Sequence, residues 1–153
     1  MKSPVNGNLL LIEKVLILKS ANIFKETPEN ILAEVAQIMD EIEYEEDAEI
    51  FKEDTIGDCM YIVHKGSVRI HKGNKTLAIL DEKEVFGELS LLDAETRSAG
   101  AVANTDCSLF KIEQEPFYDL MEARPEVAHG IIKMLCKRLR AQNERSLKDK
   151  EDS

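Results

Sequence analysis

Residues 86–99 read Phe86-Gly-Glu-Leu-Ser-Leu-Leu-Asp-Ala-Glu-Thr-Arg97-Ser-Ala99 and interrupt a series of short predicted strands. Gly87 allows a ligand to approach the backbone closely, and residues 88–92 are predicted to form one short helical turn. The first amides of such a turn have no partner within it, and its dipole favours negative charge. Arg97 follows with a planar guanidinium suited to two phosphate oxygens. The stretch therefore predicts an anion-binding site.

Glu88 adds a hydrogen-bond acceptor to this turn, and a carboxylate in that place suits a sugar hydroxyl. An anion cradle beside one hydroxyl acceptor is the arrangement that a ribose phosphate requires. The sequence thus predicts a site for a small phosphorylated sugar compound rather than for an isolated anion.

The chain as a whole is acidic, with 30 Asp and Glu against 20 Lys and Arg and a net charge of −10. An acidic surface repels DNA and anionic membranes, so nucleic acid is not the expected partner. An anionic ligand would need a local reversal of the field, which residues 86–99 can supply. At 153 residues the chain has the usual size of one domain, and we expect a single domain over 1–153.

Short strands and turns are predicted on both sides of this stretch. Apolar and polar residues alternate through 40–54, and glycine turns follow at Lys65-Gly66 and at 72–75. The other predicted strands are 59–63, 68–71, 76–80, 99–103 and 108–112. Strands this short, at this spacing, favour a sandwich or a closed barrel.

Helical spacing occurs at the two ends of the chain. Thr27 followed by Pro28 is typical of a helix N-cap and first turn, and we place a helix at about 28–40. Two further helices are predicted to begin at Glu115-Pro116 and at Arg124-Pro125, the second running to about 147. The apolar stripe expected to pack this last helix is Ala128, Ile132, Leu135 and Leu139, with Ile131 beside it.

Residues 9–18 form a long apolar stretch, which carries Glu13 and Lys14 in its middle. A membrane span needs about 20 residues with few charges, and an export signal needs an unbroken apolar centre. We therefore expect a helix that packs on the body of the domain or on a neighbour, and a cytoplasmic protein with no direct membrane insertion.

The three cysteines, Cys59, Cys107 and Cys136, match no zinc or redox spacing. Their odd number argues against a disulfide framework, so we expect small buried apolar side chains.

The segment 86–99 resembles the phosphate-binding cassette of the cyclic nucleotide-binding domain family, which includes bacterial catabolite activators, protein kinase A regulatory subunits and cyclic nucleotide-gated channels. Gly57-Asp-Cys-Met-Tyr-Ile-Val63 and Gly66-Ser-Val68 are similar to the family's glycine turn and barrel strands. Phe24 with Thr27-Pro28 resembles its helical entry, and Lys137-Arg138-Leu139 its lid helix. The resemblance covers about residues 20–145.

The resemblance implies a mainly β fold with flanking α-helices, a double-stranded β-helix or jelly-roll barrel. Helices would occupy 1–40, the jelly roll 41–115 and the C-terminal lid helices 116–147. The implied function is a sensor or regulatory module that binds a cyclic nucleotide, cAMP rather than cGMP, with no metal and no cofactor. The implied partner is an effector domain or protein, in cis or in trans, and the chain could also form a homodimer.

The resemblance also assigns roles within the site. Glu88 would accept the ribose 2′-hydroxyl and Arg97 would pair with the cyclic phosphate. Val68 and Leu77 would contact the purine, and Arg138, with Gln142 and Asn143 less directly, would cap it. The phosphate and ribose contacts are implied for Phe86, Gly87, Glu88, Leu89, Ser90, Arg97, Ser98 and Ala99.

The sequence departs from the family pattern in three places. Asp54 replaces a frequent turn glycine, which we interpret as a looser turn, and Thr96 replaces a frequent proline. Asp93 and Glu95 bring two carboxylates close in sequence to the anion site. Because like charges weaken anion binding, we expect a dissociation constant above about 0.1 µM.

Three other functions compete with this one. A metal-dependent jelly-roll enzyme would need clustered ligands, but His64 and His71 lie seven residues apart and His129 lies in the last helix, so we expect no enzyme. A DNA-binding regulator of this family carries a helix-turn-helix after the long helix, where this sequence stops. The third alternative is a degenerate, ligand-free domain for protein interaction or structure, in which Glu88 and Arg97 merely pair with each other.

Overall fold

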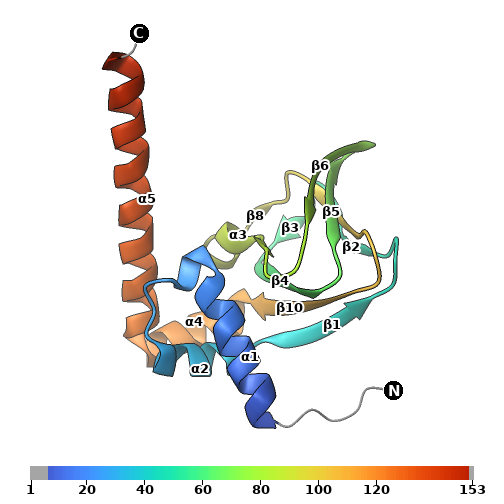
Figure 1. Ribbon diagram of the computed structural model, residues 1–153, viewed down its shortest axis with the longest axis horizontal. Coiled ribbons are helices and arrows are strands. Elements are labelled where there is room, and N and C mark those ends of the chain that lie inside the picture. Colours follow the sequence, from blue (N-terminus) through green and yellow to red (C-terminus); the bar gives the residue numbers. More distant parts are fainter. Residues whose placement is uncertain (1–6, 152–153) are drawn as a thin grey trace.

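The computed structural model describes residues 7–151, and its centre is a pair of four-stranded antiparallel sheets (Figure 1). The first sheet has the order β1-β10-β4-β7, formed by Asp40–Tyr44, Cys107–Glu113, Cys59–Lys65 and Val85–Phe86. The second has the order β2-β9-β5-β6, formed by Glu49–Phe51, Gly100–Ala103, Val68–Lys72 and Lys75–Leu80. A two-stranded ribbon joins β3 (Ile56–Gly57) to β8 (Glu95–Thr96).

Strand β4 is buried on both faces, which explains its unbroken apolar run Cys59-Met-Tyr-Ile-Val63. Tyr61 and Val63 point into a core shared with the second sheet, where Val68 and Ala101 meet them. The alternate residues of β4 and β10 point the other way, into a core shared with the helices. That second core includes Met60, Ile62, Phe110, Ile112, Phe24, Leu32 and Phe117.

The prediction of a mainly β fold with flanking helices is confirmed. Each predicted strand is found within one or two residues, and Gly73, in the left-handed region at φ +58°, turns β5 into β6. Among the described strands, backbone ladders join partners only within each sheet. The closure of the sheets into a jelly-roll barrel therefore stays a prediction.

The N-terminal helices cover one face of the first sheet. They are α1 (Gly7–Ser20), the 3-10 helix η1 (Asn22–Phe24) and α2 (Glu29–Gln37). Ile17 and Leu18 of α1 are buried in the helical core, so the apolar stretch 9–18 does pack on the body of the domain. Among the described residues, no helix combines the length and the apolar character needed to cross a bilayer.

The predicted N-cap at Thr27 is wrong. Pro28 occupies the N-cap position of α2, and its side chain makes no capping hydrogen bond. The hydroxyl of Thr27 is instead buried against the last helix, where a Cβ on Gly130 would lie 2.9 Å from it. Because Thr27 packs against α5, the helix begins one residue later than predicted, and Pro28 takes the N-cap position.

The C-terminal helices are α4 (Gln114–Ala123) and α5 (Pro125–Glu151). The predicted packing stripe of α5 is wrong at Ile132 and Leu139, which are 58% and 59% exposed, whereas Ile131 is buried and Leu135 packs against the helical core. The buried face is Val127, Gly130, Ile131 and Met134. Gly130 decides between the two faces, since a Cβ there would lie only 3.2 Å from the Glu26 backbone. Beyond this contact α5 extends away from the body of the protein (Figure 1).

The cysteines follow the prediction only in part. Cys59 and Cys107 are buried and unbridged, as expected, but Cys136 is exposed on α5. The expected burial of Cys136 is wrong, because this residue lies between Ile132 and Leu139 on the exposed face of α5.

Candidate functional site

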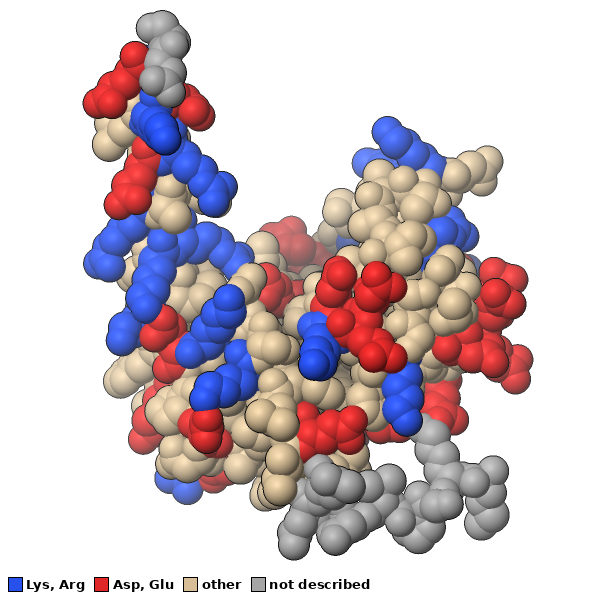
Figure 2. All heavy atoms as spheres, viewed as in Figure 1, with Lys and Arg blue, Asp and Glu red and all other residues tan. Residues whose placement is uncertain are grey.

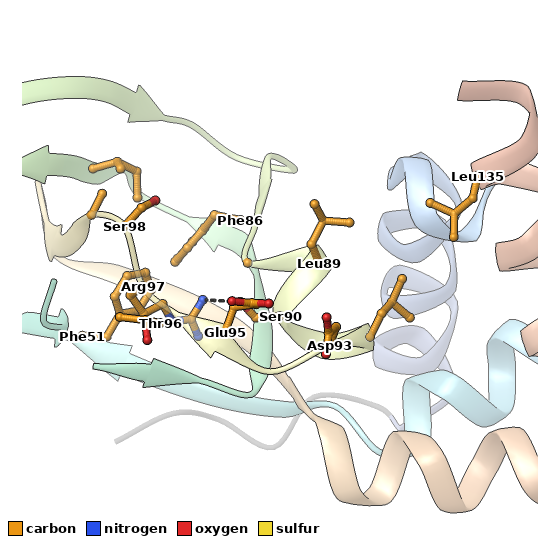
Figure 3. Close-up of a pocket in the computed structure, with 14 residues that line it drawn as sticks. Phe51, Phe86, Leu89, Ser90, Asp93, Glu95, Thr96, Arg97, Ser98 and Leu135 are labelled. Carbon is orange, nitrogen blue, oxygen red and sulfur yellow. Dashed lines mark hydrogen bonds between the residues drawn. The ribbon is translucent and has the colours of Figure 1, made fainter. Parts of the chain in front are cut away.

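A pocket of about 580 Å³ lies where the segment 86–99 meets the second sheet and α5 (Figure 3). In the space-filling view the molecule is hollowed between α5 and the β5–β6 hairpin (Figure 2). Most of the wall comes from the segment singled out in the sequence, and Phe51, Ile70 and Leu135 complete it. The segment contributes Phe86, Gly87, Leu89, Ser90, Leu92, Asp93, Glu95, Thr96, Arg97, Ser98 and Ala99.

The predicted helical turn is present as α3 (Glu88–Leu92), and Gly87 is its N-cap. Gly87 adopts φ +76°, in the left-handed region that favours glycine. A Cβ at this position would also lie 2.6 Å from Nη1 of Arg97 and 2.9 Å from the carbonyl oxygen of Cys59. Both the turn and the close approach of Arg97 therefore require a glycine here.

Arg97 is buried to 7% exposure, yet its guanidinium reaches the pocket wall. Its Nη2 donates to the carbonyl oxygen of Cys59 at 3.1 Å and to its Sγ at 3.4 Å, while Nη1 donates to Oγ of Ser90 at 3.4 Å. None of the ion pairs found between described residues includes Arg97. A buried charge held only by neutral groups is the local field reversal that an anionic ligand needs.

The segment that carries Arg97 is held by a neighbouring loop. The amide of Arg97 donates to the carbonyl of Thr55 at 2.7 Å, and the amide of Asp54 donates to the carbonyl of Arg97 at 2.8 Å. Asp54 has φ +65°, the left-handed conformation in which a glycine is common. The aspartate therefore makes a left-handed turn, with the extra backbone strain of a residue that carries a side chain.

Glu88 does not pair with Arg97. Its Oε1 accepts a hydrogen bond at 3.3 Å from Nη2 of Arg138 on α5, and both side chains are partly exposed. The expected pair between Glu88 and Arg97 is therefore not formed, and the ligand-free domain stays an alternative to be tested. The two residues expected to serve sugar and phosphate are engaged separately, by α5 and by β4.

Among the other residues of the segment 86–99, some line the pocket, but one amide expected to bind phosphate is already hydrogen-bonded. The amide of Ser90, expected in the phosphate cradle, already donates to the carbonyl of Gly87 at 3.1 Å. Ser98 and Ala99 line the pocket, as does Leu89, whose side chain is 59% exposed. An anion would thus meet the Arg97 guanidinium and the two serine hydroxyls before it could compete for this amide.

The structure does not bring all the predicted purine contacts to the pocket. Val68 is fully buried between the sheets, and Leu77 is 51% exposed on β6. Ile70, two residues beyond Val68 on the same face of β5, lies on the pocket wall instead, opposite Leu135 of α5. Arg138 bonds to Glu88 beside the pocket, and neither residue is part of the pocket wall. Gln142 and Asn143 are exposed farther along α5.

Phe51 is a pocket residue that the sequence prediction missed. Its ring centroid lies 4.1 Å from Cζ of Arg97. The same ring belongs to an aromatic cluster with Tyr61 and Phe86. Burial, together with a hydrogen bond to Cys59, raises the pKa of Tyr61, so this residue stays neutral behind the site. The signal available in the sequence was a phenylalanine in the acidic stretch 40–54, whose other aromatic residue is Tyr44.

The three histidines lie on separate elements, His64 on β4, His71 on β5 and His129 on α5. His64 is buried between two carboxylates, with Nε2 2.7 Å from Glu13 and Nδ1 3.6 Å from Glu41. In the part of the chain that the structure describes, no three His, Cys, Asp or Glu side chains gather as metal ligands would.

Residues 41–124 match the family model described as cyclic nucleotide-binding domain. The chain belongs to the cyclic nucleotide-binding domain family. This confirms the resemblance seen in the sequence. Family members that are similar along the chain include the cyclic AMP receptor protein of Thermus thermophilus, 40% identical over 102 residues, which are 63% of this chain and 47% of that protein. The CRP-like cAMP-activated global transcriptional regulator of Mycobacterium tuberculosis is 26% identical over 83% of this chain and 59% of its own length.

Solved structures agree with this membership. The N-terminal domain of a transcriptional regulator from Streptomyces coelicolor has a TM-score of 0.79 at 28% identity, covering 85% of this chain and 94% of that one. The catabolite activator protein of Thermus thermophilus has a TM-score of 0.65 at 32% identity, covering 84% and 63%. The chain spans about half the length of the curated relatives it matches first, at 47% and 59%.

Proposed function

We propose that this chain binds a purine 3′,5′-cyclic nucleotide in the pocket formed by residues 86–99 and acts as a sensor or regulatory module. The observation that carries the proposal is Arg97, a buried guanidinium on the pocket wall with no carboxylate partner among the described residues. In this proposal Arg97 binds the cyclic phosphate, with the hydroxyls of Ser90 and Ser98 beside it. Glu88 accepts the ribose 2′-hydroxyl through its carboxylate.

The base would lie between the apolar side chains of Ile70, Leu89 and Leu135, which come from the sheet, from α3 and from α5. Phe86, Gly87 and Ala99 form the remaining wall around the ribose phosphate. We favour cAMP over cGMP because the relatives matched first carry cAMP in their names. Relatives named cGMP-dependent protein kinases match as well, at 28–29% identity. The choice of adenine over guanine is therefore a separate step of the proposal, which the titration with both nucleotides tests.

Binding without catalysis is part of the same proposal. The pocket offers one guanidinium, serine hydroxyls and carboxylates, and it needs no metal or cofactor to hold a phosphate diester. We infer that the module regulates an effector in cis or in trans in the cytoplasm. We infer further that α5 carries the signal, because Leu135 lies on the pocket wall and Arg138 bonds to Glu88 at the start of α3. The exposed apolar side chains of α5 further suggest a homodimer.

The test is a calorimetric titration of the protein with cAMP and with cGMP. Micromolar binding is expected, with a dissociation constant above about 0.1 µM because Asp93 and Glu95 also line the pocket. Arg97→Ala is expected to abolish the heat, whereas Arg124→Ala, which removes an arginine outside the pocket, is expected to preserve it. Absence of binding at millimolar ligand would leave the alternative, a ligand-free module for protein interaction.

A further inference from the structure

The guanidinium of Arg97 makes two kinds of contact, one with an aromatic ring and the other through hydrogen bonds. Phe51 lies against the group with its ring centroid 4.1 Å from Cζ, a distance typical of a cation–π contact. The hydrogen bonds of the guanidinium, to Cys59 and Ser90, run from its Nη1 and Nη2 atoms at the edge. A buried cation is thus stabilised partly by an aromatic ring rather than by a carboxylate.

The ring of Phe51 is itself fixed in place. Its centroid lies 6.0 Å from that of Tyr61 and 6.0 Å from that of Phe86, and Tyr61 and Phe86 stack at 5.0 Å with an interplanar angle of 15°. Phe51 ends β2, and its backbone pairs with Ala101 of β9. The surface on which Arg97 rests therefore belongs to the sheet core and does not depend on a mobile side chain.

We propose that Phe51 is the positioning residue for Arg97, holding the guanidinium by a cation–π contact so that the N–H groups not bonded to Cys59 and Ser90 stay free for an anion. A carboxylate partner would accept hydrogen bonds from those same N–H groups and would compete with a phosphate. An aromatic partner attracts the charge without using any N–H group, so the two contacts are compatible. The ligand part of this inference rests on the proposed function, whereas the contact itself does not.

The first arm of the test uses ligand-free protein. An aromatic ring at this distance shifts the NMR signals of the Arg97 side-chain nitrogens and their protons, so these signals are expected to move when Phe51 is replaced by Leu. Phe51→Tyr keeps the ring and is expected to keep the shift. Unchanged Arg97 signals in Phe51→Leu would overturn the proposal whether or not any nucleotide binds.

The second arm measures cAMP affinity by calorimetry. Phe51→Leu is expected to weaken binding about 2- to 30-fold, the range of a cation–π contact, and Phe51→Tyr is expected to restore it. Mono-, di- and trifluorinated phenylalanine at position 51 changes the ring's charge with little change in size, so affinity should fall stepwise along the series. The same series at Phe117, fully buried in the helical core, is the control and should leave affinity unchanged.

The outcomes separate the two ideas. Wild-type protein that binds no cyclic nucleotide, but whose Arg97 signals respond to Phe51→Leu, contradicts the proposed function and retains Phe51 as the positioning residue. Wild-type protein that binds the nucleotide with an affinity independent of fluorination at position 51 overturns the inference and leaves the proposed function intact.

Discussion

Arg138, at the middle of α5, donates from Nη2 to Oε1 of Glu88, the first residue of α3, at 3.3 Å. The bond joins the C-terminal helix to the turn that begins the pocket wall. It uses one oxygen of the carboxylate, and the second oxygen remains available for a hydroxyl donor. Under the proposed function, Arg138 would orient Glu88 for the ligand, and the ligand would in turn strengthen the attachment of α5.

The first prediction concerns this bond. Arg138→Met keeps the aliphatic part of the side chain and removes the donor, so Glu88 loses its orientation. Because both partners are partly exposed, we expect cAMP affinity to fall only about 2- to 5-fold. Hydrogen exchange should show that cAMP protects the first half of α5 in the wild type and no longer does so in the variant. Tighter binding in Arg138→Met would mean that Arg138 blocks Glu88 and would contradict the prediction.

The second prediction concerns the slot that Arg97 occupies. A Cβ added to Gly57 would lie 2.1 Å from Nε of Arg97, so Gly57→Ala must displace the guanidinium. Charge-assisted hydrogen bonds contribute about 1.5–3 kcal/mol each, and we expect cAMP affinity to fall roughly tenfold or more. Gly73→Ala is the matched control, because that glycine has open space around it and lies in a hairpin turn at φ +58°. It should lower the melting temperature slightly and leave affinity unchanged.

The third prediction concerns the two carboxylates on the pocket wall. Asp93 and Glu95 are exposed, and their charge opposes an anionic ligand. Asp93→Asn and Glu95→Gln are each expected to tighten cAMP binding about 2- to 5-fold at low ionic strength, and the gain should shrink as salt is added. Asp81→Asn and Glu82→Gln, each made singly, are the controls, because each makes the same change of charge in a loop outside the pocket. If these controls tightened binding equally, net charge and not the pocket wall would be responsible.

The site was predictable where its information is local. The turn of α3, the glycine at its N-cap and the arginine that follows all lie within residues 86–99, and their geometry follows from a few neighbouring residues. Phe51 was not predictable in this way, because it meets Arg97 only after β2 has paired with β9. The bond between Glu88 and Arg138 spans 50 residues and depends on how α5 is rotated.

The rotation of α5 about its axis could not be predicted from the spacing of its apolar residues. Helical spacing in α5 supports a stripe through Ile132 and Leu139 as well as one through Val127 and Ile131. The deciding feature is Gly130, which lets α5 approach the Glu26 backbone and turns the second stripe inward. Similarly, Val68 and Ile70 share one face of β5, and only the position of α3 and α5 over the sheet selects Ile70 for the pocket.

The fourth prediction concerns pH. Glu26 holds α5 through Lys137, and that hydrogen bond, with the nearby charges of Lys137 and Lys133, lowers the pKa of Glu26 below its ordinary value of 4.5. A carboxyl whose folded-state pKa is depressed stabilises the fold above its unfolded value, and the contribution is lost as the pH falls through the folded value. The melting temperature of Glu26→Gln should therefore lie below that of the wild type at pH 7.

This difference between Glu26→Gln and the wild type should shrink once the pH drops below about 4.5. Lys137→Met should lose most of the same stabilisation at pH 7, since it removes the hydrogen bond that contributes most to the lowered pKa of Glu26. Thermal unfolding followed by circular dichroism from pH 7 to pH 3 measures all three proteins. A difference that stayed constant down to pH 3 would show that Glu26 acts through packing and not through its charge.

The fifth prediction concerns the free face of α5. Ile132, Leu139 and Leu147 are 58–63% exposed, and every residue from Arg140 to Glu151 is exposed to solvent. A helix that leaves the body of the protein with apolar side chains uncovered gains from burying them against a second copy.

We expect sedimentation equilibrium to show a dimer whose proportion rises with concentration. Leu139→Lys should make the protein monomeric, whereas Arg140→Lys, one residue farther along the helix with its charge retained, should not. A wild-type protein that stayed monomeric at its highest soluble concentration would contradict the prediction. The effector would then be the first partner to test on this face of α5.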